Sequence, residues 1–167
     1  MAIREIRVMG DPILNKRCKE VTEMTDRLKT LVEDMYETMY EADGVGLAAS
    51  QVGILKRIVV IDVGDEQPVT LVNPRLVETS GEQTGNEGCL SVPGKVGIVT
   101  RPDYAKVLAF DIDMKPIEVE GTGLKARALC HELEHLDGHL YVEKVEGELM
   151  NANELPDEEE EASEDEG

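Results

Sequence analysis

Residues 25–41 carry the clearest helical pattern in the first half of the chain. Apolar side chains recur there at intervals of three and four residues, while Glu, Lys and Arg occupy most other positions; the apolar set is Leu28, Leu31, Val32, Met35, Met39 and Tyr40. This spacing gathers the apolar side chains on one side of a helix. Thr25 or Asp26 is suited to cap the first turn. The sequence therefore predicts an amphipathic helix over residues 25–41.

The stretch from residue 57 to residue 121 has the pattern of β-strands. Residues 57–64 are an apolar run that ends in glycine, residues 68–78 hold apolar runs on either side of Asn73-Pro74, and residues 96–121 hold three more. Short β-branched runs bounded by Gly, Pro or Asn are typical of strands joined by turns. We predict a strand at 57–64, a turn at Asn73-Pro74 between two strands, and three further strands with a hairpin near residues 114–116.

Helical spacing returns at residues 122–137, and Gly138 is suited to end that helix. The order is thus helix, strands, helix. Strands that follow one another through short turns pair antiparallel, which indicates an α+β fold. We predict one catalytic domain over residues 1–150, in which antiparallel sheets pack around the second helix.

Composition and charge narrow the possible partners. The chain has 167 residues, 41% of them hydrophobic, which suits a single packed domain. Its net charge is −19, and residues 154–167 contain nine acidic residues and no basic ones. Such a run of like charges predicts an acidic disordered tail over residues 151–167. The negative charge opposes direct binding to DNA and to anionic membranes.

The cellular location follows from what the chain does not contain. The N-terminal residues are too charged for a signal peptide, and no apolar stretch approaches the roughly 20 residues of a membrane-spanning helix. The three cysteines are sparse and odd in number, which favours reduced thiols. We therefore predict a cytoplasmic protein.

The strongest chemical signal is the segment His131-Glu132-Leu133-Glu134-His135. On a helix, His131 and His135 share a face, so both imidazoles can bind one metal ion with Glu132 beside the bound water. The chain contains only three histidines, which makes a chance pair at this spacing less probable. The alternative is a solvent-facing helix that carries two unrelated histidines.

A catalytic metal site of this kind needs a third protein ligand. His139 follows the helix-ending Gly138 and is expected at the surface, and the glutamates from Glu154 onward lie in the predicted tail. Cys89 remains as a candidate, because a thiolate is a good ligand for a borderline metal. The alternative for Cys89 is a small buried side chain, the usual role of a lone cysteine.

Three segments, in this order, resemble the peptide deformylase family: residues 44–51 (GVGLAASQ), 87–91 (EGCLS) and 131–138 (HELEHLDG). Residues 9–14 (MGDPIL) and 72–74 (VNP) are also similar to the family, and the resemblance covers about residues 4–150. The chain departs from it at Cys130, where the family often has Gln, and at Glu134, where it often has Asp. We expect Glu134 to change the geometry around the metal ligands and the rate, but not the type of reaction.

The resemblance implies a metal-dependent hydrolase that removes the N-formyl group from the initiator methionine of nascent polypeptides and releases formate. Cys89, His131 and His135 would hold one divalent metal ion per chain, Fe²⁺ in the cell, although Zn²⁺, Ni²⁺ or Co²⁺ suits the same ligands. Glu132 would act as general base toward the metal-bound water, and the resulting hydroxide would attack the formyl carbon. N-formylmethionyl peptides are the implied partners, met at the ribosome near the exit tunnel.

The resemblance also implies roles for residues around the metal. The side-chain amide of Gln51 and the backbone N–H of Leu90 would stabilise the oxyanion. Gly44, Gly46 and Gly88 would let the substrate backbone approach closely. Val45, Leu124 and Ala128 would line a pocket for the methionine side chain. Glu87, Arg101 and Glu134 would support the metal ligands.

Two other functions fit the same helix. A zinc peptidase of another family would use the two histidines without needing Cys89 or Gln51. A non-catalytic protein with a structural metal would need a fourth protein ligand, and the sequence offers no clear one.

Overall fold

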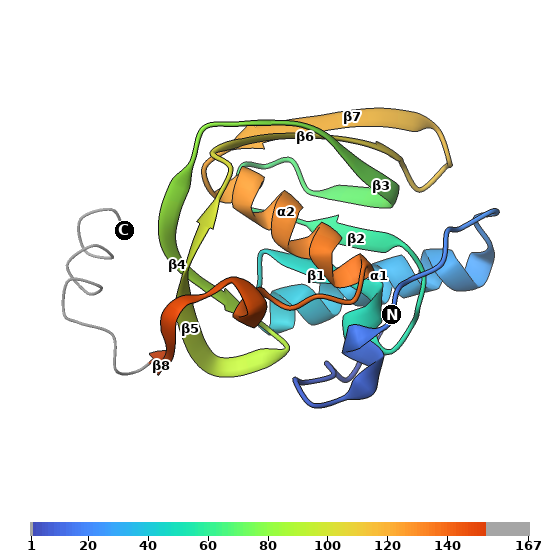
Figure 1. Ribbon diagram of the computed structural model, residues 1–167. Coiled ribbons are helices and arrows are strands. Elements are labelled where there is room, and N and C mark those ends of the chain that lie inside the picture. Colours follow the sequence, from blue (N-terminus) through green and yellow to red (C-terminus); the bar gives the residue numbers. More distant parts are fainter. Residues whose placement is uncertain (1, 153–167) are drawn as a thin grey trace.

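The computed structural model describes residues 2–152, which form an α+β fold with two antiparallel sheets (Figure 1). One sheet has the strand order β1-β2-β3-β6-β7 and the other has the order β4-β5-β8. The strands of the first sheet are β1 (Gly46–Ala48), β2 (Ile58–Ile61), β3 (Val69–Ser80), β6 (Tyr104–Phe110) and β7 (Pro116–Thr122). Those of the second are β4 (Gln83–Cys89), β5 (Val92–Arg101) and β8 (Glu146–Asn151).

Two helices complete the fold. Helix α1 (Asp26–Glu41) precedes the sheets, and helix α2 (Leu124–Leu136) lies in the middle of the molecule with strands around it (Figure 1). Short 3-10 helices occupy Pro12–Asn15, Ala49–Val52 and Tyr141–Lys144. The predicted α+β class, with antiparallel sheets around the second helix, is confirmed.

Strand β2 lies between two hydrophobic clusters, which explains its uninterrupted apolar run. Val59 and Ile61 belong to the cluster that contains α2, whereas Ile58 and Val60 belong to the cluster that contains α1. All four side chains are buried. A strand covered on both faces has no polar alternation. The β2 strand therefore joins the two halves of the core directly beside the helix that carries the candidate metal ligands.

Helix α1 agrees with its prediction. Thr25 caps it, because the hydroxyl of Thr25 accepts a hydrogen bond from the backbone N–H of Leu28 at 3.2 Å. Met35 and Met39 are fully buried and contribute to the cluster with β1 and β2. Most of the predicted apolar face therefore packs, but Tyr40, which was predicted to belong to it, is 49% exposed.

The predicted turn at Asn73-Pro74 is wrong. Strand β3 runs through this dipeptide, and its register with β6 shifts between Val72 and Arg75, which marks a bulge. Asn73 has φ +52°, and its side-chain amide bonds both backbone groups of Val21, at 2.8 and 2.9 Å. A bulge accommodates the unusual φ and the missing proline N–H without reversing the chain.

Helix α2 is shorter than the predicted 122–137. Thr122 is the last residue of β7, and Gly123, with φ +60°, separates that strand from the helix. At the other end Gly138 has φ +87°, and its N–H bonds the carbonyl of His135 at 3.0 Å. The glycine end was thus correctly predicted, because the left-handed conformation there favours glycine.

Strands β4 and β8 were not predicted. Strand β4 reads QTGNEGC, with little apolar content, and is a strand because it pairs with β5. Strand β8 pairs with the other edge of β5 and ends at Asn151, one residue past the predicted domain boundary. The rest of the predicted acidic tail, from residue 153 onward, lies outside the described residues. In the part of the chain that is described, neither helix is long and apolar enough to span a membrane.

Candidate metal centre and active site

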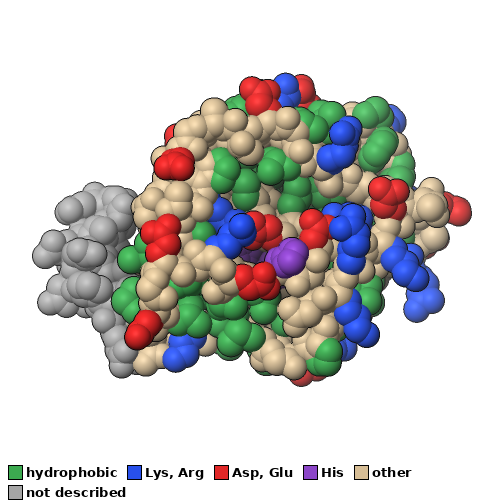
Figure 2. All heavy atoms as spheres, in the orientation of Figure 1, with side chains coloured by type: hydrophobic (Ala, Val, Ile, Leu, Met, Phe, Trp, Pro, Cys, Tyr) green, Lys and Arg blue, Asp and Glu red, His purple; other side chains and the backbone are tan. Residues whose placement is uncertain are grey.

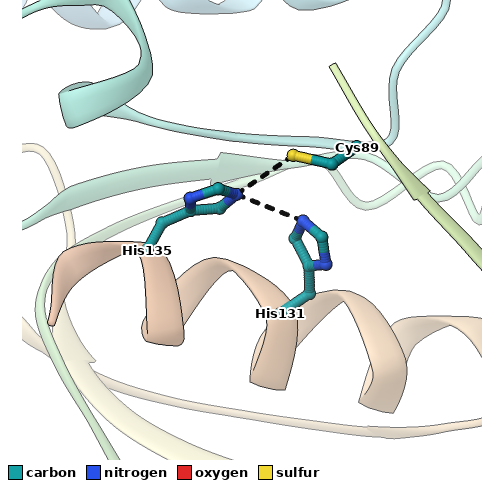
Figure 3. A group of neighbouring side chains, drawn as sticks. All are labelled: Cys89, His131 and His135. Atoms are coloured by element: carbon teal, nitrogen blue, oxygen red, sulfur yellow. Dashed lines mark hydrogen bonds between the residues drawn. The ribbon is translucent and has the colours of Figure 1, made fainter. Parts of the chain in front are cut away.

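Helix α2 places two histidines and a glutamate in the interior of the molecule. His131 is 7% exposed, His135 1% and Glu132 4%. Cys89 is the last residue of β4, which runs past the helix. Figure 3 shows the Cys89 sulfur and both imidazole rings turned toward one another across the space between the strand and the helix. The sheet and the helix together therefore assemble a group that neither element could form alone.

The three donor atoms lie at distances that suit a bound metal ion. Sγ of Cys89 is 3.2 Å from Nε2 of His135, and that nitrogen is 3.2 Å from Nε2 of His131. All three atoms lie within 4.8 Å of one another. Two imidazole nitrogens on one tetrahedral ion, each about 2.0–2.1 Å from it, are themselves about 3.3 Å apart. One thiol and two imidazoles also suit a borderline divalent metal, so the residues fit the predicted ion.

A buried carboxylate holds the other ring nitrogen of His131. Oε2 of Glu87 accepts a hydrogen bond from Nδ1 of His131 at 2.5 Å and another from Nη2 of Arg101 at 2.7 Å. Nε of Arg101 donates to Oε1 of Glu87 at 3.1 Å. This contact sets which ring nitrogen carries the proton and leaves Nε2 of His131 facing Cys89 and His135. Glu87 and Arg101, which the resemblance assigns to the support of the site, thus form a buried ion pair.

Glu134 joins the same network from the next turn of α2. Its Oε2 accepts a hydrogen bond from Nη1 of Arg101 at 2.8 Å and lies 3.6 Å from Nζ of Lys144. Arg101 therefore bridges two carboxylates, Glu87 beside His131 and Glu134 at the edge of the helix. The longer side chain at position 134 still reaches the arginine.

Burial and hydrogen bonding set the charges of these groups. Burial raises the pKa of Glu132 to about 7. Burial also lowers the pKa of His135 well below its usual range, so its imidazole is neutral, the form that binds a metal. For Glu87, burial acts to raise the pKa, but the hydrogen bonds from His131 and Arg101 outweigh it and hold the pKa well below its ordinary value. Glu87 is therefore ionised at neutral pH.

Gln51 reaches the centre from the 3-10 helix that follows β1. Its Oε1 accepts from the backbone N–H of Ala48 at 2.9 Å, which orients the amide. Its Nε2 donates to the hydroxyl of Ser91 at 3.0 Å and lies 3.6 Å from Sγ of Cys89. The backbone N–H of Ser91 also points to that sulfur, at 3.4 Å. Two N–H groups thus face the sulfur of Cys89.

The glycines of residues 44–51 bring the backbone close to the side chains of Glu132 and Leu90. A Cβ atom on Gly46 would lie 2.6 Å from Oε2 of Glu132, and one on Gly44 would lie 2.7 Å from Cδ1 of Leu90. Neither glycine has a positive φ. Close approach, not unusual backbone conformation, is therefore the reason for glycine at both positions.

A cavity of about 580 Å³ opens beside the centre. Its lining includes most of the residues predicted for substrate binding and catalysis: Gly44, Val45, Gly46, Gly88, Cys89, Leu90, Leu124, Ala128, His131 and Glu132. Val45 and Leu124 are partly exposed at 38% and 50%, so both also face solvent. A ligand in this cavity would lie against Cys89, His131 and the Glu132 carboxylate at once.

Comparison with known proteins decides the family. The family model described as Polypeptide deformylase matches residues 3–150. The chain belongs to the polypeptide deformylase family. A peptide deformylase of Lachnoclostridium phytofermentans is 62% identical over 163 residues, covering 96% of this chain and all of that protein. One from Agathobacter rectalis is 66% identical over 149 residues, covering 89% and 94%. The crystal structure of peptide deformylase from Thermotoga maritima has a TM-score of 0.83 and 42% identity, covering 87% and 99%.

Polypeptide deformylases are metal-dependent hydrolases that remove the N-formyl group from nascent peptides. The predicted family and reaction are thus confirmed. The alternatives of a zinc peptidase from another family and of a non-catalytic metal protein are wrong. His139, which was expected at the surface, is 56% exposed in its side chain and lies beside Glu143.

The sequence did not reveal two residues of this deformylase site. Arg127 donates to Glu87 at 2.7 Å, and Ser91 bonds the amide of Gln51. Arg127 stands four residues before His131 and thus on the same face of α2, a spacing that could have identified it. Ser91 lies within the segment EGCLS, but its contact with Gln51 joins two parts of the chain that no local pattern connects.

Proposed function

We propose that Cys89, His131 and His135 bind one divalent metal ion per chain and that Glu132 is the general base of deformylation. The observation that carries this proposal is the convergence of the three donor atoms, within 4.8 Å of one another, beside the buried Glu132. When bound, such an ion polarises a carbonyl and makes a water molecule acidic near neutral pH. We assign Fe²⁺ as the ion in the cell, following the family resemblance, while Zn²⁺, Ni²⁺ and Co²⁺ suit the same ligands.

The environment of Glu132 supports its role as base. Its Oε2 lies 3.9 Å from Nε2 of His131, which places the carboxylate beside the metal ligands. Its Oε1 is buried and has no hydrogen-bond partner within residues 2–152. Burial raises the pKa of Glu132 to about 7 in the metal-free protein, and a base whose pKa lies near the working pH transfers protons efficiently. Glu132 therefore takes a proton from water and delivers it to the peptide nitrogen that leaves as formate is released.

Gln51 and Leu90 supply the hydrogen bonds that the oxyanion needs. The amide of Gln51 has two N–H groups. One of them donates to Ser91 and the other faces the Cys89 sulfur, so the second must turn from the sulfur to the formyl oxygen when the substrate binds. The backbone N–H of Leu90 follows directly on the metal ligand Cys89. Removal of one such donor typically lowers the rate by about 10²–10³-fold.

Substrate binding uses the cavity and the glycine-rich edges around it. We assign Val45, Leu124 and Ala128 to the pocket for the methionine side chain, since all three line the cavity. Gly44, Gly46 and Gly88 allow an extended peptide backbone to approach the protein closely. Glu87, Arg101 and Glu134 support the site through the network on His131.

The remaining assignments concern the chain as a whole. We propose that the catalytic domain spans residues 1–150 together with Asn151, the last residue of β8, and that the acidic residues after it form a tail outside the domain. We also propose that the protein acts in the cytoplasm on peptides near the ribosomal exit tunnel. On the face shown in Figure 2, Lys and Arg side chains are scattered among acidic ones instead of forming a continuous basic patch. Substrate encounter therefore depends on the peptide and not on attraction of this face to RNA.

The direct test is formate release from formyl-Met-Ala-Ser by anaerobically purified protein. The wild type should release formate, and Glu132→Gln should lose at least about 10²-fold in kcat, the size of a typical general-base contribution. Glu143→Gln, which removes an exposed carboxylate outside the site, should behave as the wild type. Metal content is measured for all three proteins. Undiminished release by a metal-loaded Glu132→Gln protein would remove Glu132 from the mechanism.

A further inference from the structure

Arg127 links the network around the metal ligand to a second strand. Its Nη1 donates to Oε1 of Glu87 at 2.7 Å, and its Nη2 donates to the backbone carbonyl of Val99 on β5 at 3.2 Å. The residue is 8% exposed. One planar guanidinium thus ties helix α2 to β4 and β5 at the position of Glu87.

The Glu87 carboxylate is fully used only when Arg127 is present. A carboxylate has about four acceptor positions on its two oxygens. Arg101 fills two, His131 fills a third and Arg127 fills the fourth. The arginines also balance the buried charge, since two cations face the carboxylates of Glu87 and Glu134. Without Arg127, Glu87 would keep its contact with His131 but lose one anchor and half of its cationic partners.

We propose that Arg127 is a positioning residue of the metal centre, which acts by holding Glu87 so that His131 keeps its ring orientation toward Cys89 and His135. This inference rests on the proposed metal ligands. Residues that orient a metal ligand from behind typically alter metal affinity by about 10–100-fold when they are replaced. The two terminal nitrogens of the Arg127 guanidinium, here called its fork, hold Glu87 in place by donating to Glu87 and to the Val99 carbonyl at once. A single ammonium group cannot donate to both in the same way.

The test measures Co²⁺ binding by the full chain, without substrate. Co²⁺ affinity is determined by competition with a chelator, and the visible spectrum of bound Co²⁺ reports the geometry of its ligands. Arg127→Met keeps an unbranched apolar stem but removes the guanidinium; it should weaken Co²⁺ binding by about 10–100-fold and change the spectrum. The control is Arg57→Met, because Arg57 also bonds α2, at the carbonyl of Leu136, but does not contact Glu87. It should stay within about 3-fold of the wild type, below that range.

A double-mutant cycle separates positioning through Glu87 from a merely structural role. If Arg127 acts through Glu87, Arg127→Met should have little further effect on Co²⁺ binding once Glu87 is Gln. An equal loss in both backgrounds, or Arg127→Met affinity and spectrum like those of Arg57→Met, would overturn the proposal. Arg127→Lys, which keeps the buried charge, covers the case of a misfolded Met variant: it should bind Co²⁺ more weakly than the wild type, and unchanged binding would refute the role of the fork.

The outcomes distinguish this inference from the proposed function. A wild-type protein that binds Co²⁺ only weakly, or not at all, would contradict the metal site itself. A wild type that binds Co²⁺ and releases formate, together with an unaffected Arg127→Met protein, would refute only the role of Arg127.

Discussion

Replacement of Gly46 by Ala should move the general base without disturbing the fold. The added Cβ atom would lie 2.6 Å from Oε2 of Glu132, 2.9 Å from its Cγ and 3.0 Å from its Cδ. Non-bonded atoms in favourable contact are about 3.5 Å apart, so the carboxylate oxygen must retreat by roughly 0.9 Å, the difference between the two distances. Because Glu132 is buried between β1 and α2, the whole end of the side chain must shift.

The expected loss follows from this displacement. A misplacement of about 1 Å at a reacting group can cost about 10²-fold in rate. Gly46 has no positive φ, so Ala is compatible with the backbone there, and the crowding should lower the free energy of unfolding by no more than about 1–3 kcal/mol. We therefore expect Gly46→Ala to bind metal as the wild type does while its kcat/KM falls by about 10²-fold.

The assay is formate release coupled to NADH formation by formate dehydrogenase, with metal content and urea unfolding measured on the same samples. Gly85→Ala is the matched control, since its Cβ would lie at an ordinary 3.7 Å from Arg127 Nη2. It should keep wild-type activity. A Gly46→Ala enzyme with full metal content and activity within about 3-fold of wild type, far from the expected loss, would refute the argument that Gly46 is required by the position of Glu132.

Three further predictions concern the ligands, the base and the buried ion pair. Cys89→Ser should weaken metal binding by more than about 100-fold, which exceeds the effect of replacing a residue that only orients a ligand. Cys18→Ser is the control and should bind metal as the wild type does. Equilibrium dialysis with Zn²⁺ measures both variants, and equal affinities would exclude Cys89 as a ligand. Because burial raises the pKa of Glu132 to about 7 from its ordinary 4.5, the metal-free protein should lose stability as the pH rises through this interval. Glu132→Gln should remove that loss, with a free energy of unfolding about 3 kcal/mol above wild type at pH 8 and only about 1 kcal/mol above it at pH 5; urea unfolding that shows no pH-dependent difference would contradict the shift. Arg101→Met leaves the buried Glu87 without its main partner and should cost about 3–5 kcal/mol of unfolding free energy; a cost below about 1 kcal/mol, the value of an exposed pair, would mean that water reaches this network.

The helices and strands that could be predicted are those whose formation depends on residues within a single segment. Helix α1 and the buried strand β2 follow from the spacing of apolar residues in single segments, and the glycine end of α2 follows from one residue with φ +87°. The turn at Asn73-Pro74 was wrongly predicted, because turn residues also serve a bulge, and only the pairing of β3 with β6 distinguishes the two. Strand β4 has no apolar pattern of its own, so its pairing with β5 could not be read from its residues.

The candidate site divides in the same way. By itself, the sequence placed His131 and His135 on one helical face, since residues four apart on a helix share a face. The resemblance to a family added Cys89, Gln51 and the glycines. Only the tertiary structure decided how these residues meet. Cys89 is 46 residues from His135, and Glu87 is 40 residues from Arg127. Contacts over such separations depend on strand register and on the packing of α2 against the sheets, and no local periodicity records either of them.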